Sequence, residues 1–423
     1  MKQLDKGCFV FDAPQIKYTI TIVLFCSMIH FVKNSVLPAG FLIANIIGAG
    51  MFALPFVFQQ SGLMPGVLYL GFFGILAALI HLIYADIILR TRETRQQFPG
   101  YIRQYLGKNA GMFAGLLVFT TLLFTLTAYL VLSASFLHIL IPTLSPIIAM
   151  LFFWVLATVT IFITIKRTAV FDTVTAGITL AVIGVLFIYW GLVFPFDSDA
   201  FPILTTKNVL VPFGPVLFSF IGFSAIPALV AYVRKESVPF SNMKKAIVVG
   251  SLTPALFYFL YVVAVWGMSP TVSPDSVSGL IGNAPFFILL ALSILGFISL
   301  WDSYSGVGRD INKLLEYEWH ITPPIALAIT AGAPPALYMF GFQDFIALIS
   351  AVGGILFSIW GILIIFAWKK AIKVSIPSVK FSEIYIPDRV YSIINDIPTF
   401  VIDLLVLVFV GGIIYELASL LTR

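Results

Sequence analysis

The chain has 423 residues, of which 60% are hydrophobic and 10% are charged, and its mean hydropathy is +1.05. A water-soluble core of this size cannot bury so much apolar surface, so the composition excludes a soluble globular protein and predicts an integral membrane protein. The formal net charge of +5 would suit a nucleic-acid partner, but the placement of the basic residues, given below, explains it better.

The first 35 residues precede the first long apolar segment. Residues 16–32 are apolar but about one turn too short for a comfortable membrane span. They could form a twelfth membrane helix, an interfacial segment or an extension outside the fold, and we favour the last two. No cleavable signal peptide is evident. Cys8 and Cys26 are the only cysteines, too few for a disulfide framework or a metal cluster, and we expect free thiols.

Eleven nearly charge-free runs of about 20 residues follow. A helix of this length crosses about 30 Å of hydrocarbon. They lie at 36–60, 62–89, 110–140, 146–165, 173–194, 212–233, 246–268, 285–305, 323–341, 345–368 and 398–420. No polar linker separates soluble domains, so we expect one membrane-embedded unit. Its parts are an N-terminal segment (1–35), a core of ten spans (36–397), and an eleventh span with the C-terminus (398–423).

The basic residues alternate between the two sides of this predicted arrangement. If the N-terminus lies in the cytoplasm, the cytoplasmic segments carry 22 of the 24 lysines and arginines, and only Lys207 and Arg423 lie outside. This bias follows the positive-inside rule. It predicts a multi-pass protein of the cell (inner or plasma) membrane with a cytoplasmic N-terminus. We expect the lipid bilayer and a small solute as partners, no nucleic acid and no obligatory protein partner.

The first span, 36–60, is interrupted at its middle. Gly48-Ala49-Gly50 lies inside a charge-free stretch, and Pro55 follows five residues later. An unpaired backbone amide costs several kcal/mol in hydrocarbon, so a break at this depth survives where it lines a protein cavity or meets a ligand. The break therefore indicates a transporter.

The sixth span, 212–233, contains a second break around Gly222, and Pro227 follows it. The two breaks are five spans apart, and because five is odd, the interrupted spans cross the membrane in opposite directions. Interrupted helices at matching positions of two inverted halves, about 36–194 and 212–368, predict a 5+5 inverted-repeat transporter that binds its solute near the midplane. The alternative is that these glycines only allow close helix packing.

Two motifs resemble a known family. The residues Asn45-Ile46-Ile47-Gly48-Ala49-Gly50-Met51-Phe52-Ala53-Leu54-Pro55 resemble the first-helix motif of the amino acid/auxin permease family, especially its bacterial hydroxy and aromatic amino acid permease branch, which includes tyrosine and tryptophan permeases. The run Ser219-Phe220-Ile221-Gly222-Phe223-Ser224-Ala225-Ile226-Pro227 resembles the sixth helix of the same branch.

This resemblance covers nearly the whole chain after residue 35. It weakens in span eight, where Ser293-Ile294-Leu295-Gly296 and Leu300-Trp301-Asp302 have altered spacing. It implies an all-α integral membrane protein of about 11 transmembrane helices, with a LeuT-like fold whose helices 1 and 6 are broken. The resemblance also implies membership of the amino acid/polyamine/organocation superfamily and transport of amino acids by ion symport.

An amino acid brings a carboxylate and an ammonium that must both lose their water. Free amides at the start of the half-helix after Gly50 suit the carboxylate, and glycine lets a ligand approach the backbone. We expect the carboxylate to bind at Gly48, Ala49, Gly50 and Met51. We expect the ammonium and part of the side chain to bind at Phe220, Gly222, Phe223 and Ser224. The resemblance places Asn45 close to substrate or sodium, although an interhelical hydrogen bond would explain it too.

The coupling ion stays open between a proton and sodium. His81, deep in span two, is of a residue type that titrates near neutral pH and could exchange protons, although a neutral histidine hydrogen-bonded between helices is commoner. Sodium needs oxygen ligands, and the resemblance implies the carbonyls of Ala44 and Ile47 with a hydroxyl from span eight, for which Ser293 is the candidate. Asp302 and most other ionisable residues of the spans lie near span ends, where interfacial hydration explains them.

The sequence has no His-Glu-x-x-His, no Gly-x-Ser-x-Gly and no glycine-rich phosphate loop, so we expect neither an enzyme nor a bound cofactor. A sensor of the same fold, which binds an amino acid without transporting it, would share the binding chemistry. Such sensors usually add a sizeable soluble segment, and the predicted loops here are short. The sequence predicts a secondary active transporter that imports uncharged, aromatic or hydroxylated amino acids by proton or sodium symport with alternating access.

Overall fold

The computed structural model describes residues 3–4, 8–9, 27–91, 97–162, 169–194, 201–205, 208–373 and 398–422. Helices make up nearly all of this, apart from two-residue strands, β1 (Gln3–Leu4) and β2 (Cys8–Phe9), which pair antiparallel. Most of the ambiguous segment 16–32 and both cysteine side chains lie outside the described part. The end of that segment begins a helical stretch, Ser27–Ile46, that leads directly into the first span.

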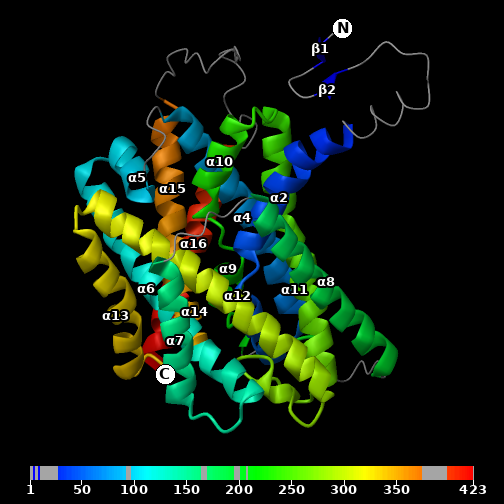
Figure 1. Cartoon of the computed structure of the whole chain (residues 1–423). Coiled ribbons are helices and arrows are strands. Elements are labelled where there is room, and N and C mark those ends of the chain that lie inside the picture. Colours follow the sequence, from blue (N-terminus) through cyan, green and yellow to red (C-terminus); the bar gives the residue numbers. More distant parts are fainter. Residues whose placement is uncertain are drawn as a thin grey trace, which may run out of the picture.

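The helices follow one another along the chain with short connections. In chain order they are η1 (Val32–Val36), α2 (Leu37–Ile46), η2 (Ala49–Ala53), α3 (Leu54–Ser61), α4 (Leu63–Arg90), α5 (Phe98–Leu106), α6 (Lys108–Leu140), α7 (Pro146–Phe162), α8 (Ala169–Val193), α9 (Phe213–Ser219), α10 (Ala225–Lys235), α11 (Phe240–Met268), η5 (Ser278–Leu280), α12 (Phe286–Lys313), η6 (Leu314–Glu318), α13 (Pro323–Met339), α14 (Phe345–Ser350), η7 (Ala351–Phe357), α15 (Ser358–Ala371) and α16 (Thr399–Thr422) (Figure 1).

Eight continuous helical segments of the described chain are long and apolar enough to cross a membrane. One of the eight, Ser27–Ile46, contains only the first half of the predicted first span, which continues as η2 and α3. The other predicted spans are the shorter helices α7 and α13, and the sixth span, which is divided into α9 and α10. Each of the eleven predicted runs therefore corresponds to a helix or to an interrupted helix. The domain boundaries at residues 35 and 397 stay predictions.

The helices run between two faces of the molecule. We call the upper one in Figure 1 the α5 face, because it carries α5 together with the start of α2 and the ends of α4 and α10; the other is the opposite face. In the described part of the chain, the basic residues lie toward the α5 face. They are Lys33, Arg90, Arg103, Lys108, Arg234, Lys235, Lys244, Lys245, Arg309, Lys313, Lys369, Lys370 and Lys373.

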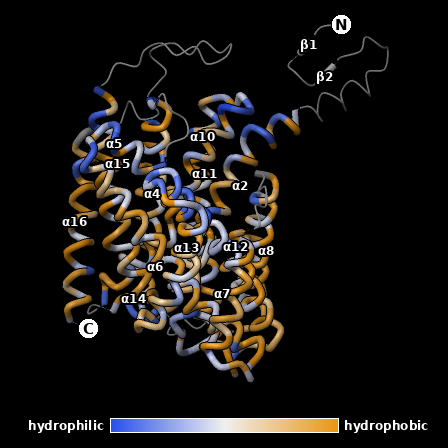
Figure 2. The backbone as a smooth tube through the Cα atoms, turned by 60° about the vertical axis from the view of Figure 1, so that its left-hand side comes forward, coloured by the Kyte–Doolittle hydropathy of each residue, from blue (hydrophilic) through white to orange (hydrophobic). Residues whose placement is uncertain are grey.

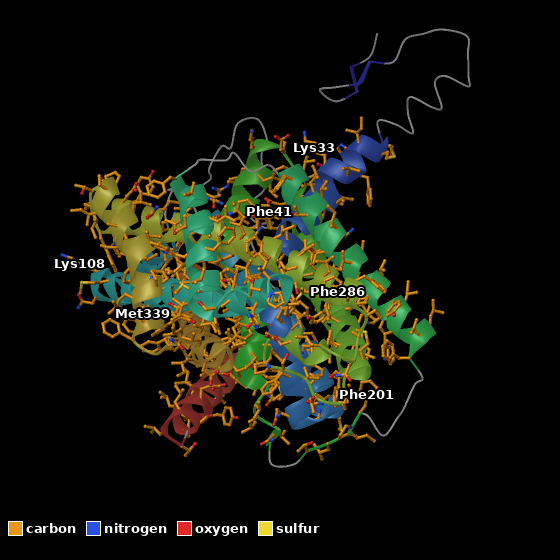
Figure 3. The ribbon with its side chains drawn as sticks, turned by 60° about the horizontal axis from the view of Figure 1, so that its bottom comes forward. Lys33, Phe41, Lys108, Phe201, Phe286 and Met339 are labelled. Carbon is orange, nitrogen blue, oxygen red and sulfur yellow. The ribbon has the colours of Figure 1, made fainter. Side chains whose placement is uncertain are left out.

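The flanks of the helices are apolar (Figure 2). Large hydrophobic side chains remain exposed there, including Phe286 and Met339, with exposed fractions of 69% and 67% (Figure 3). Exposure on this scale would be unfavourable in water and suits a hydrocarbon surrounding.

The two interrupted spans approach the centre from opposite faces. The first enters from the α5 face as α2 and continues as α3, whereas the sixth enters from the opposite face as α9 and continues as α10. This is the inverted relation that the odd span count predicted. Helices α4 and α11 pack against these half-helices, while α12 packs against α6, α7 and α13.

Between the first break and the opposite face, side chains and a loop close the structure. The ring of Phe52 in η2 meets that of Phe136 in α6 edge to face, with centroids 4.8 Å apart, and Ser276 donates a hydrogen bond to the Phe52 carbonyl. Gln59 of α3 holds the same loop, since its side chain accepts from the Val272 amide at 2.9 Å. The cavities described below lie instead in the half of the molecule nearer the α5 face.

Candidate functional site

The first span is unwound where Gly48 predicted a break. The α-helix α2 ends at Ile46, Ile47 has an extended backbone (φ −76°, ψ 102°), and Gly48 is also non-helical (φ −147°, ψ −148°). The chain then resumes as the 3₁₀ helix η2, in which the Met51 amide donates to the Gly48 carbonyl at 3.3 Å. The backbone groups of this stretch therefore have few partners within their own helix.

The sixth span is interrupted between Ser219 and Ala225. The two breaks meet: a Cβ placed on Gly50 would lie 2.6 Å from the Ser219 hydroxyl oxygen and 2.8 Å from the Ser219 Cα. A Cβ on Gly222 would lie 2.8 Å from the Ile46 side chain. Glycine is thus required at positions 50 and 222 for the two unwound stretches to approach each other.

His81 joins the second break to α11. Its Nε2 accepts a hydrogen bond from the Gly222 amide at 3.2 Å, and its Nδ1 lies 2.9 Å from the Ser251 hydroxyl; the ring is fully buried. Because Nε2 accepts, the proton of a neutral ring must sit on Nδ1 and be donated to Ser251. This is the interhelical hydrogen-bonded histidine that the sequence left as the alternative to a proton carrier.

Tyr258 of α11 bridges the two breaks. Its buried hydroxyl donates to the carbonyl oxygens of Ile46, at 3.0 Å, and Ser219, at 2.8 Å. Tyr129 of α6 lies next to Tyr258 and to Ser303 of α12. The sequence analysis did not single out either tyrosine, because a chain with 16 tyrosines gives no signal of which hydroxyls face the breaks.

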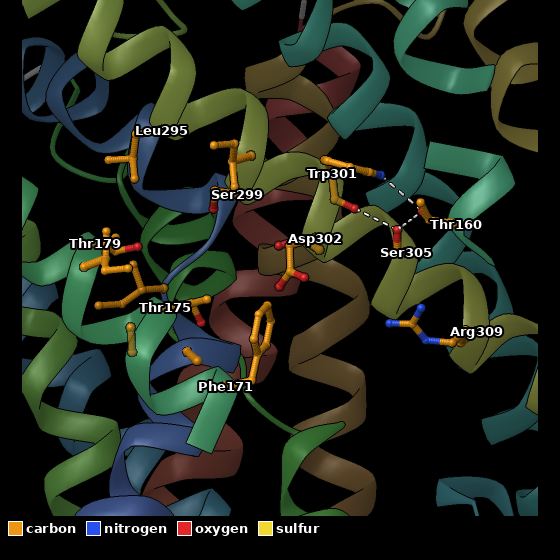
Figure 4. Close-up of a pocket in the computed structure, with 16 residues that line it drawn as sticks. Thr160, Phe171, Thr175, Thr179, Leu295, Ser299, Trp301, Asp302, Ser305 and Arg309 are labelled. Carbon is orange, nitrogen blue, oxygen red and sulfur yellow. Dashed lines mark hydrogen bonds between the residues drawn. The ribbon is translucent and has the colours of Figure 1, made fainter. Parts of the chain in front are cut away.

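A cavity of about 400 Å³ lies between α2, α7, α8 and α12 (Figure 4). Ala44 and Ile47, the two predicted carbonyl ligands of sodium, line it. From α12 come Ser299, Asp302 and Ser303, and from α8 come Thr175 and Thr179. A Cβ on Gly48 would lie 3.4 Å from the Ser303 hydroxyl oxygen, so this hydroxyl is adjacent to the first break.

Ser293, the predicted hydroxyl from α12, does not line this cavity. It is fully buried about three turns from Ser303, and its hydroxyl has no hydrogen-bond partner. Ser293 therefore does not lie with Ala44 and Ile47, as was expected, and Ser303 is the α12 hydroxyl that lies beside the first break. Ser293 was chosen because it lies near the midpoint of the apolar run in span eight, where the family resemblance is weak. In the structure, the midpoint of this run is not at the level of the first break. Asp302, which interfacial hydration was expected to explain, also lines the cavity.

The wall between α7 and α12 is held by polar contacts. The Trp301 indole donates to Thr160 at 3.1 Å, Ser305 hydrogen-bonds Thr160, and the Ser305 hydroxyl donates to the Trp301 carbonyl at 2.9 Å (Figure 4). Every hydroxyl of this group has a partner in the protein. These hydrogen bonds hold α7 and α12 together along this wall of the cavity.

A second cavity, of about 580 Å³, lies beside the second break. Phe223 and Ser224 line it, together with the aromatic side chains Tyr84, Phe98, Tyr317 and Trp360 and the charged pair Asp310 and Lys313. The Phe223 ring packs against Trp360 and His81, with centroids 5.3 and 5.5 Å apart. Phe220 is buried against Tyr258, at 5.6 Å.

The remaining predicted site residues are divided between the breaks and the helix surface. Ala49, Gly50 and Met51 are buried in the first break. Asn45 is exposed, and its amide donates to the Phe41 carbonyl one turn earlier, at 2.8 Å. In the described part of the chain, no group of three or more His, Cys, Asp and Glu side chains is placed to hold a metal ion.

Comparisons with solved structures support the fold. The chain is similar to MhsT in complex with L-phenylalanine (TM-score 0.59, 14% identity, covering 88% of this chain and 98% of that one). It is also similar to Mhp1, a nucleobase-cation-symport-1 family transporter (0.55, 11%, 91% of each), and to a manganese transporter of Eremococcus coleocola (0.55, 13%, 97% of each). At these identities the likeness shows the fold alone, and it confirms the all-helical LeuT-like prediction.

No curated protein matches the chain. Residues 33–268, more than half of the chain, match the family described as transmembrane amino acid transporter protein. The match begins just before α2 and ends with α11, so it contains both breaks, Tyr258 and His81. The chain belongs to this family of transmembrane amino acid transporters, and it is a multi-pass membrane transporter rather than an enzyme.

Proposed function

We propose that the protein imports uncharged amino acids with aromatic or hydroxylated side chains, by cation symport with alternating access. The observation that carries this proposal is the meeting of two unwound stretches, at Gly48–Gly50 and 219–224, in the middle of the helix bundle. Their amides and carbonyls can replace the water that an amino acid's carboxylate and ammonium lose. The predicted contacts at both breaks are retained as the proposed substrate site.

The aromatic preference has two supports. The breaks resemble those of hydroxy and aromatic amino acid permeases, and the cavity beside Phe223 is lined by four further aromatic rings. Aromatic side chains pack favourably on such rings in offset or edge-on geometry. The resemblance to that branch is itself part of the proposal, as is the direction of transport.

The orientation follows from charge. Because the basic residues of the described chain lie toward the α5 face, the positive-inside rule assigns this face, with the N-terminus, to the cytoplasm. Both cavities lie in this half, and Phe52 and Phe136 close the opposite half. The arrangement then corresponds to a conformation open toward the cytoplasm of an inner or plasma membrane.

For the coupling ion we favour sodium. Hard cations prefer oxygen ligands, and the cavity beside the first break offers the Ala44 and Ile47 carbonyls, the Ser303 hydroxyl and the Asp302 carboxylate. His81 is less suited, since both of its ring nitrogens already hold Gly222 and Ser251. Protonation of Asp302 is the other chemistry that this set allows.

Uptake into proteoliposomes tests the proposal. Purified protein is reconstituted, radiolabelled tyrosine, tryptophan and serine are supplied, and a sodium or a proton gradient is imposed separately. Sodium-driven uptake that unlabelled aromatic amino acids compete would support the proposal, and proton-driven uptake would correct the ion. Binding of an amino acid without any uptake would contradict transport and favour the sensor.

A further inference from the structure

Tyr258 is fully buried at the point where two half-helices end. Its hydroxyl oxygen is 3.0 Å from the Ile46 carbonyl and 2.8 Å from the Ser219 carbonyl, and it donates toward both. Ile46 is the last residue of α2, and Ser219 is the last residue of α9. A single phenolic proton is therefore shared between the C-terminal ends of two helices.

These two carbonyls are ones that a helix cannot satisfy by itself. In the last turn of a helix, no amide four residues later is in place to donate a hydrogen bond to the carbonyl. Each helix C-terminus also carries the equivalent of about half a negative charge. Two such ends directed at one point form a position that attracts a positive charge, and half-helix C-termini bind coupling cations in transporters with broken helices.

The phenol blocks that position. The Tyr258 ring is held edge to face by Phe220, with centroids 5.6 Å apart, so the hydroxyl is anchored rather than free to withdraw. The ring is fully buried beside these two carbonyls, so it occupies space there that an ion and its water would otherwise take. The proposed sodium ligands are distinct, because Ala44 and Ile47 line the cavity between α2, α7, α8 and α12, whereas Ile46 does not line it.

We infer that the Tyr258 hydroxyl takes the place of a coupling cation between the ends of α2 and α9, so that the protein binds at most one cation and moves at most one with each substrate. The part that concerns movement rests on the proposed function. The part that concerns binding does not. Tyr258 is thus a positioning residue that fixes the charge carried in each cycle.

Equilibrium binding of radioactive sodium to the purified full-length protein tests the binding part without transport. We expect at most one ion per wild-type chain. Tyr258→Asn removes the ring and supplies a carbonyl oxygen beside Ile46 and Ser219, so this variant should bind one ion more than wild type. Tyr258→Phe removes the donor but leaves no room, and it should bind the wild-type number.

Tyr304→Asn is the matched control. Tyr304 is also fully buried, its hydroxyl lies next to Thr158, and its ring packs on Phe153 of α7. This variant should gain no ion. Two ions bound to the wild type, or an unchanged number in Tyr258→Asn, would overturn the inference.

The charge moved per substrate gives a second measurement on the wild type, which decides the matter if Tyr258→Asn does not fold. The reversal potential of uptake into proteoliposomes should correspond to one charge per zwitterion. Two charges would overturn the inference and leave the proposed amino acid transport intact. Absence of any uptake would instead contradict the proposed function, and the sodium count would still decide the role of Tyr258.

Discussion

At the scale of single residues, the two glycines of the first break have different roles. Gly50 allows contact between the breaks, since a Cβ there would lie 2.8 Å from the Ser219 backbone. Gly48 has more space, because its Cβ would meet only the Ser303 hydroxyl, at 3.4 Å. The sequence offered approach of a ligand and close helix packing as reasons for these glycines, and it could not show that Gly50 packs on Ser219, which lies 169 residues later in the chain.

Gly50→Ala tests this packing. The added methyl group must push Ser219 away, and overpacking of this kind costs about 1–3 kcal/mol. If this cost is added to the free-energy barrier of the transport cycle, uptake should fall about tenfold or more. Initial rates of amino acid uptake measure the effect, normalised to protein in the membrane. Gly71→Ala, on α4 with nothing within 4 Å of its Cβ, is the control and should transport normally. Normal uptake by Gly50→Ala would contradict the close contact.

Ser303 and Ser293 provide a second pair at this scale. If Ser303 contributes a sodium ligand, Ser303→Ala should raise the sodium concentration for half-maximal uptake by about tenfold, the loss expected for one polar ligand worth about 1.4 kcal/mol. Asp302→Asn should raise this sodium concentration further, because it removes a negative charge that attracts the cation. Ser293→Ala should have no effect on sodium dependence. The reverse result for the two serines would restore the original assignment.

At the scale of elements, the breaks were predictable but the groups that hold them were not. Glycine followed by proline within one turn or so marks a helix that cannot continue, and both interrupted spans occur where this pattern predicted them. His81 and Tyr258 are separated by about 140 and 40 residues from the backbone groups they bind in the second break. No periodicity connects such distant positions. Asp302 and Ser303 of α12 were not predicted as site residues, because the sequence analysis judged the depth of a residue in the membrane from its distance to the ends of the span.

His81 offers the prediction that belongs to this scale. His81→Leu leaves the Gly222 amide and the Ser251 hydroxyl without a partner in a buried region, which should cost about 1–3 kcal/mol of stability and lower the Tm. His81→Gln keeps an acceptor for the amide and should lose less. The pH profile of uptake should be the same in His81→Gln and wild type. A profile that loses its pH dependence in that variant would instead identify His81 as a proton carrier.

At the scale of the whole molecule, composition and charge predicted more than any motif. The eleven apolar runs and their alternating direction account for the helix order, and the lysines and arginines of the described chain lie toward one face, as the count by segment required. What the runs could not give is the packing of one helix on another, because each span is apolar on nearly all sides. The cavities depend on that packing, so their linings were beyond a reading of single spans.

Cysteine labelling tests the orientation. In a background with Cys8 and Cys26 replaced by serine, Lys108→Cys places a thiol at the α5 face, and Phe340→Cys places one at the opposite face, where Phe340 is 83% exposed. A membrane-impermeant maleimide added to intact cells should label position 340 and leave position 108 unlabelled until the membrane is opened. Labelling in the opposite order would place the α5 face outside the cell.

Helix α16 lies outside both repeats, yet its Glu416 side chain fills space that two glycines leave free. A Cβ on Gly214 of α9 would lie 2.6 Å from the Glu416 carboxylate oxygen, and one on Gly354 of η7 would lie 3.0 Å from it. Any rearrangement of α9 must therefore displace a side chain of a peripheral helix. A fluorophore attached at the outward-facing Ile414 or Leu417 would report each turnover optically, from a site remote from the ligand route.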